Sequence, residues 1–211
     1  ERQNLREFVP ASAAQAESES PYFVAVNEAA RRLGFIAAGV FVQDRNSRLY
    51  QARLALWTSP DRQTLLRIGG GKTAGVPVKR TTLTSLLEPD RLVETSDDFG
   101  MADLSGLTDR KVALNADLDE LLARHQERLA ECPGAKRFFS TTQALAAYEA
   151  IQAMRAAQME RLGLGQFLNR ERTIWRHTLK GAWFSYYKGL RAQLAEGMAQ
   201  KDRSALKRPG E

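Results

Sequence analysis

The chain has 211 residues, of which 43% are hydrophobic and 27% are charged, and its formal net charge is +6 at pH 7. This composition is typical of a globular protein with one large domain, or with one domain and an appendage. The single cysteine excludes an internal disulfide framework. The longest apolar run, residues 35–42, is too short for a membrane-spanning helix.

The positive charge is concentrated at the C-terminal end. Residues 161–211 hold 11 Lys and Arg residues against 4 Asp and Glu residues, a net charge of +7. Residues 1–160 hold 20 basic and 21 acidic residues, a net charge of −1. Attraction to a polyanion, to an acidic membrane surface or to a protein partner is therefore expected to be local to the C-terminal end.

The first 20 residues are predicted to form a flexible arm or linker, because most of them are small, polar or acidic. A helix is expected to follow, with Pro21 in its first turn and Ser20 as its N-cap. The helix should end near Leu33, because Gly34 is a typical residue just beyond a helix C-terminus.

Alternating hydrophobic and polar residues come next, with turn residues about every ten positions. The alternation predicts an antiparallel meander of four or five strands. The runs that carry it are residues 35–43, 49–59, 64–68, 78–87 and 91–95.

Helical periodicity dominates the rest of the chain. Three helices are expected, at residues 114–131, 143–162 and 169–198, with residues 201–211 as a frayed tail. Because the strands and helices are segregated, the predicted fold class is α+β. The predicted body covers residues 21–135, and residues 136–200 hold a helical pair that either packs on the body or projects from it.

A glycine run precedes a lysine at residues 69–73 and resembles the end of a phosphate-binding loop. The full motif needs a glycine five residues before Gly71, and the chain has Leu66 there. A flexible turn is the favoured interpretation. The exposed amides of Gly70, Gly71 and Lys72 would then form a weak anion site.

Titratable residues do not group into a catalytic or metal-binding pattern. His125 falls on the apolar face of its helix, so it is expected in the core or at its edge. His177 lies among basic residues, and Cys132 lies at a helix end with Pro133 after it. No catalytic residue, metal ion or cofactor is expected from these positions.

Acidic residues cluster around the fifth predicted strand and the loop after it. The cluster consists of Asp90, Glu94, Asp97, Asp98 and Asp103. A solvated loop is the favoured interpretation. An enzyme whose site is assembled from residues 97–103 is the alternative, since paired carboxylates hydrolyse glycosides or hold hard cations.

The last predicted helix combines basic and aromatic residues. Arg172, Arg176 and Lys180 recur every four residues and would form one basic ridge. Lys188 and Arg191 extend the basic side, and the candidate interface aromatics are Trp175, Trp183 and Tyr187. If these aromatics are buried, the segment is architectural, and if they are exposed, it is a contact surface.

The sequence favours a non-catalytic interaction or sensor module of unknown ligand. The chain begins with Glu1, so an anchor upstream that makes this the soluble part of a membrane-anchored protein is one expectation. Nucleic-acid binding through the basic helix and the enzyme described above are the alternatives. The expected partners are a protein, an acidic membrane surface or a second copy of the chain. The expected location is the cytoplasm or the cytoplasmic face of a membrane.

Overall fold

The computed structural model describes residues 2–4, 8–11, 21–43, 50–73, 76–98, 104, 106–184 and 187. The strands are β1 (Arg2–Asn4), β2 (Phe8–Pro10), β3 (Ile36–Gln43), β4 (Tyr50–Thr58), β5 (Leu65–Thr73), β6 (Val76–Leu87), β7 (Arg91–Ser96), β8 (Thr108–Val112), β9 (Gly165–Phe167) and β10 (Ile174–His177). The helices are α2 (Pro21–Arg32), α3 (Leu118–Glu131), the short 3₁₀ helix η1 (Thr141–Gln143) and α4 (Ala144–Arg161).

The main sheet has seven strands in the order β2-β3-β4-β5-β6-β7-β8, so the predicted meander of four or five strands is wrong. Strands β3 to β7 correspond to the five predicted runs and pair antiparallel. The additional strands are β2, within the predicted arm, and β8, which pairs parallel with β7. Neither shows hydrophobic alternation, because β2 has three residues and β8 reads Thr-Asp-Arg-Lys-Val. The α+β class is confirmed.

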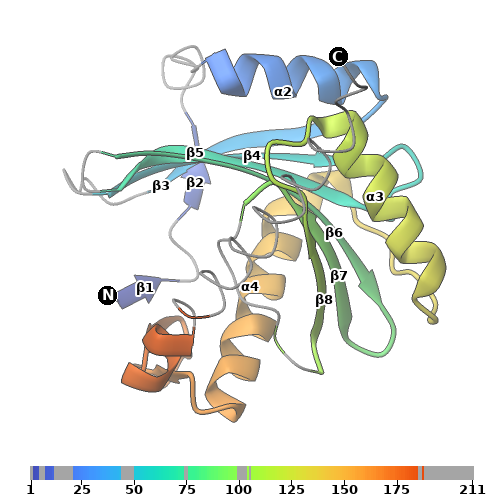
Figure 1. Ribbon diagram of the computed structural model, residues 1–211. Helices are drawn as coiled ribbons and strands as arrows, with labels where there is room; N and C mark the ends of the chain where they lie inside the picture. The colour runs from blue at the N-terminus through green and yellow to red at the C-terminus, as the bar shows by residue number, and fades with distance from the viewer. Residues whose placement is uncertain are drawn as a thin grey trace, which may run out of the picture.

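Helices cover both faces of the curved main sheet (Figure 1). Helices α2 and α3 lie on one face and α4 lies on the other. A buried hydrophobic cluster fills each interface: Trp57, Leu66 and Leu83 belong to the α2 and α3 side, while Leu54 and Leu92 belong to the α4 side. Because side chains alternate along a strand, neighbouring residues contribute to opposite clusters. The strands are therefore apolar on both faces.

The predicted glycine turn is wrong, because residues 69–71 lie inside β5. Gly70 pairs with Arg53 of β4 and Lys79 of β6, so its backbone is held on both sides and makes no exposed anion turn. A Cβ atom on Gly70 would lie 2.3 Å from Cε2 of the buried Phe23 ring. The glycine therefore gives α2 room to pack closely on the sheet.

The predicted helix at residues 169–198 is wrong in its first part. Residues Ile174–His177 form β10, which pairs antiparallel with β9 and β1 to make a second, three-stranded sheet. Ile174 and Trp175 favour a strand, and Trp175 packs against Gly165. Helical structure begins at residue 179, and the predicted part beyond Tyr187 lies outside the described residues.

The other predicted helices are confirmed with small shifts in their ends. Helix α3 begins at Leu118, where Asp117 caps it by accepting a hydrogen bond from the Glu120 amide at 2.9 Å. Asn115, with φ of +56°, lies in the preceding turn. Within the described part of the chain, each helix is too short or too polar to cross a bilayer.

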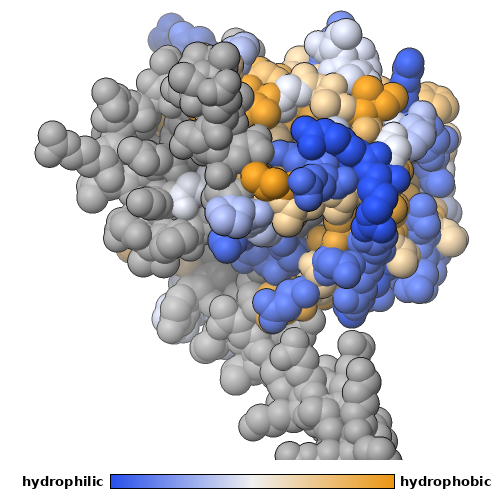
Figure 2. Space-filling model, turned by 90° about the horizontal axis from the view of Figure 1, so that it is seen from above, coloured by the Kyte–Doolittle hydropathy of each residue, from blue (hydrophilic) through white to orange (hydrophobic). Residues whose placement is uncertain are grey.

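The outer side of α2 is mainly hydrophilic. Figure 2 shows this side, where hydrophilic residues gather over the middle and hydrophobic residues form small separate patches. Val24 and Ile36 are the large hydrophobic residues exposed on α2 and at the start of β3, at 40% and 43%. Isolated exposed residues of this kind are common on soluble surfaces and indicate no binding site.

Candidate functional site

The register of β5 to β8 brings polar side chains together on the sheet face that α4 covers. Arg67 pairs across the sheet with Thr82, and Thr82 pairs with Ser96. The neighbouring row consists of Thr84, Glu94 and Arg110. Directly opposite residues in paired strands point to the same face. We call the charged residues of this face, together with Arg155 of α4, the arginine cluster: Arg67, Arg80, Glu94, Asp98, Arg110 and Arg155.

Glu94 is the deepest member of the arginine cluster. Its side chain is 2% exposed and forms an ion pair with Arg155 of α4, which is 4% exposed. Thr84 Oγ1 also donates a hydrogen bond to Glu94 Oε1 at 2.9 Å. Burial by itself raises the pKa of Glu94, but the charges of Arg155, Arg110 and Arg67 hold it below its ordinary value. Glu94 is therefore a buried carboxylate that stays ionised.

The positive groups repel one another across this face. Burial lowers the pKa of Arg110 to about 10; Glu94 opposes this effect, while Arg155, Arg80 and Arg67 add to it. Arg67 Nη2 donates a hydrogen bond to Thr82 Oγ1 at 3.0 Å, and its guanidinium lies 5.8 Å from the centre of the Tyr148 ring. Among the described residues, four guanidinium groups therefore lie close to one another on this side of the sheet, together with the carboxylates of Glu94 and Asp98.

The outer edge of the arginine cluster is partly open to solvent. Arg80 Nε donates to Asp98 Oδ2 at 2.5 Å, and the two side chains are 24% and 28% exposed. Arg110 Nη2 donates to the Asp98 backbone oxygen at 2.8 Å. Beside Arg80, a Cβ on Gly69 would meet the Arg80 oxygen at 3.7 Å, an ordinary contact distance. The arginine cluster is therefore accessible to solvent at Arg80 and Asp98.

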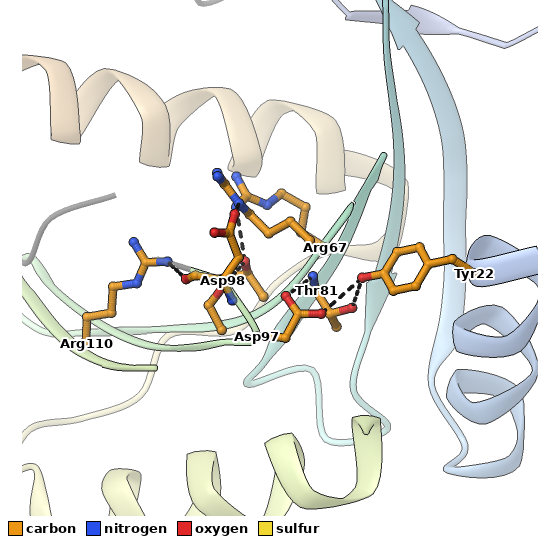
Figure 3. A network of polar contacts seen from close by, with 9 residues as sticks. Tyr22, Arg67, Thr81, Asp97, Asp98 and Arg110 are labelled. Atoms are coloured by element: carbon orange, nitrogen blue, oxygen red, sulfur yellow. Dashed lines mark hydrogen bonds and ion pairs between the residues drawn. The ribbon is translucent and has the colours of Figure 1, made fainter. Parts of the chain in front are cut away.

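Asp97 and Asp98 are adjacent in sequence but serve opposite faces of the sheet (Figure 3). Asp97 Oδ1 accepts a hydrogen bond from the Thr81 amide at 2.6 Å, and Asp97 Oδ2 accepts one from Tyr22 of α2 at 3.1 Å. Burial raises the pKa of Asp97, against the effect of these hydrogen bonds. Burial and the charge of Asp97 likewise raise the pKa of Tyr22.

The predicted acidic cluster is thus divided between three environments. Glu94 and Asp98 belong to the arginine cluster, Asp97 binds α2, and Asp90 lies 3.2 Å from Arg137 at an exposed turn. Asp103 lies outside the described residues. Among the described residues, His, Cys, Asp and Glu side chains form no group of three or more suited to a metal ion.

His125 is in the core, as predicted. It is fully buried, and its Nε2 and Nδ1 atoms each lie 3.1 Å from a hydroxyl, those of Ser85 and Thr95. Burial lowers its pKa to about 4. Cys132 ends α3, with Sγ 3.7 Å from Asp109 Oδ2, and burial raises the pKa of its thiol. Neither group lines the arginine cluster.

The predicted basic ridge is absent as a helical feature. Arg172 has φ of +54° and pairs with Glu160 at 2.7 Å, Arg176 is in β10, and Lys180 Nζ donates to the Leu162 oxygen at 3.1 Å. Lys188 and Arg191 lie outside the described residues. Nucleic-acid binding through basic residues spaced every four positions on a helix therefore loses its geometric basis.

The candidate aromatics divide between the core and the surface. Trp175 is buried, whereas Trp183 and Tyr187 are 67% and 47% exposed. The three residues of the predicted anion turn, Gly70, Gly71 and Lys72, lie in strand β5. The backbone of Gly70 and Gly71 pairs with β4 on one side and β6 on the other.

Sequence reasoning missed the arginine cluster, although one signal was present. Arg67 lies between Leu66 and Ile68, and Glu94 lies between Val93 and Thr95, so each charge interrupts a hydrophobic or β-branched run. A charge inside a strand that is buried on both faces needs a partner there. Arg110 gave no such signal, because β8 is polar throughout.

The arrangement is chemically suited to holding an anion. Guanidinium groups bind carboxylate and phosphate oxygens through paired N–H donors, and Thr82 and Ser96 add hydroxyls to the same face. The chain matches no protein-family model, no curated protein and no solved structure.

Proposed function

We propose that this protein is a non-catalytic binding module whose ligand carries a carboxylate or phosphate group, and that this group binds in the arginine cluster. The observation that carries the proposal is the gathering of four guanidinium groups, those of Arg67, Arg80, Arg110 and Arg155, on one largely buried side of the sheet. Guanidinium groups held close together away from water repel one another, and a bound anion offsets that cost.

The position of each charge supports a binding role. Glu94 is buried, ion-paired and low in pKa, so it serves as a counter-ion and is poorly suited to proton transfer. Arg80 and Arg67 are both partly exposed, whereas Arg155 is buried. The ligand's anionic group is placed beside these two arginines. We assign the module to the cytoplasm or the cytoplasmic face of a membrane, in keeping with its single cysteine.

Inorganic phosphate is a suitable probe. The free energy of unfolding is measured in urea with increasing phosphate, with chloride replacing it to keep the ionic strength constant. Wild type is expected to gain about 1 kcal/mol once phosphate exceeds its Kd several-fold. Arg67→Gln should remove most of this gain, because it deletes one donor fork from the open part of the cluster.

Arg91→Gln is the matched control. Arg91 is also a strand arginine that binds a carboxylate, Asp109, at 2.9 Å, but on the other face of the sheet. The control should lose some stability and keep the phosphate effect. If wild type responds equally to phosphate and chloride, or if Arg91→Gln and Arg67→Gln lose the phosphate effect alike, the proposed site is incorrect.

A further inference from the structure

A second surface lies at the opposite end of the molecule from α2, on the helical segment that follows β10. Residues 179–184 and residue 187 are helical. In Figure 1 this segment, drawn in orange-red, lies beside the C-terminal end of α4. Thr178 fixes its start, because its amide donates to the Leu164 oxygen at 3.1 Å.

The inner side of this helix is closely packed. A Cβ atom on Gly181 would lie 1.7 Å from the Leu164 oxygen, so the helix backbone directly contacts the turn between α4 and β9. Phe184 packs against the hydrophobic cluster on the α4 side. The orientation of the helix is therefore fixed, and its other side must face outward.

The outward side carries large apolar residues. Leu179, Trp183 and Tyr187 are 92%, 67% and 47% exposed, and their four-residue spacing places them along one line. Lys180 is exposed next to them. We call these four residues the outer helix face.

The segment of the chain that carries the outer helix face is positively charged. Residues 161–187 contain five basic residues and one acidic residue, a net charge of +4. Exposed leucine and tryptophan with tyrosine and lysine beside them are the combination found in helices that lie in the headgroup region of a bilayer. Basic residues favour anionic headgroups.

We propose that the outer helix face docks on the surface of an anionic lipid bilayer. Leu179 and Trp183 enter the headgroup boundary, Tyr187 keeps its hydroxyl near water, and Lys180 meets lipid phosphate or carboxylate groups. This proposal is independent of the anion site under α4, because it uses different residues from a different part of the chain.

Tryptophan emission tests the proposal directly. The chain has three tryptophans; Trp57 and Trp175 are 5% and 3% exposed, so Trp183 is the one that a bilayer would newly cover. Vesicles of phosphatidylcholine with phosphatidylserine should shift the emission to the blue and co-sediment with the protein. Vesicles of phosphatidylcholine alone should do so much less. Trp183→Phe should remove the spectral shift while keeping co-sedimentation.

Leu179→Glu is expected to weaken co-sedimentation by about tenfold or more, because it places a negative charge where an apolar residue met anionic lipid. The matched control is Phe138→Glu, which replaces another exposed apolar residue, 72% exposed, in the segment between α3 and α4. Both sites are on the surface, so circular dichroism should show unchanged folding. Arg67→Gln should also keep vesicle binding.

The proposal fails if the anionic vesicles do not bind, or if Phe138→Glu weakens binding as much as Leu179→Glu. It fails also if Arg67→Gln abolishes binding, which would assign the lipid contact to the arginine cluster. A blue shift that depends on protein concentration without lipid would assign the outer helix face to a second copy of the chain, and would overturn the proposal.

Discussion

Glu94 is the residue on which the charge balance of the α4 side depends. Replacement by Gln keeps its size but leaves Arg155, Arg110 and Arg67 without their buried counter-ion. We expect Glu94→Gln to lower the free energy of unfolding by about 3–5 kcal/mol in chloride, the range for breaking a buried ion pair. Phosphate should restore more stability to this variant than to wild type, because the arginine cluster has lost one negative charge. Urea unfolding in the two salts measures both effects.

Asp109→Asn separates this effect from the loss of any carboxylate between arginines. Asp109 binds Arg128 and Arg91 at 2.8 and 2.9 Å, and those arginines are 35% and 40% exposed. Because they can turn toward water, the loss should be about 1 kcal/mol, without a specific response to phosphate. An equal response of the two variants to phosphate would contradict the role given to Glu94.

At the residue scale, sequence reasoning succeeded where one element decided the environment. His125 could be placed in the core from the helical periodicity of α3 alone. Glu94 and Arg155 could not be brought together, because they are 61 positions apart and meet only through the packing of α4 on the sheet. Trp175 and Trp183 received the same prediction, and the strand β10 separated them.

Among the elements, β5 has a packing requirement that differs between two neighbouring glycines. Gly70 faces α2 with a potential Cβ only 2.3 Å from the Phe23 ring, whereas Gly69 faces α4 with its nearest neighbour at 3.7 Å. Gly70→Ala should cost about 1–3 kcal/mol from overpacking, because Phe23 is buried and cannot move away freely. Gly69→Ala, one residue away in the same strand, should change stability by about 0.5 kcal/mol or less. Urea unfolding of both variants gives the comparison, and equal losses would contradict the assigned packing.

The elements that the sequence predicted well carry a strong local signal of their own. Helix α4 is rich in alanine, strand β3 is a continuous apolar run and strand β4 alternates, so their positions agreed with expectation to within a few residues. The glycines of β5 resembled a turn because glycine has no side chain to show a pattern. Strand β8 depends on pairing with β7, a tertiary contact that its own composition does not indicate.

Across the whole molecule, each helix that covers the main sheet has a buried polar contact with it. In α2, Asn27 Oδ1 accepts a hydrogen bond from Trp57 Nε1 at 3.1 Å. In α3, His125 lies between two hydroxyls of the sheet, and in α4, Arg155 binds Glu94. Hydrophobic contacts alone would allow a helix to slide over an apolar surface. These polar contacts fix each helix in one position, since displacement would leave buried groups unsatisfied.

The contact in α3 makes the stability of the whole chain depend on pH. His125 has a pKa of about 4 in the folded chain and about 6.5 when unfolded, so between these values the unfolded chain binds more protons. Stability should therefore fall as the pH is lowered through this range. The contribution of His125 should be about 2 kcal/mol between about pH 7.5 and about pH 5.

His125→Gln tests this dependence, because glutamine keeps polar atoms but does not titrate. The variant should be less stable than wild type at about pH 7.5, where it loses hydrogen bonds to Ser85 and Thr95, and the difference should shrink or reverse toward about pH 5. Asp97 works in the opposite sense, since a raised pKa makes its contribution largest at low pH, but both proteins share it. Both proteins also share His177, whose pKa is lowered by burial, as that of His125 is. The difference between the two unfolding curves against pH therefore isolates His125, and parallel curves would mean that it does not couple α3 packing to protonation.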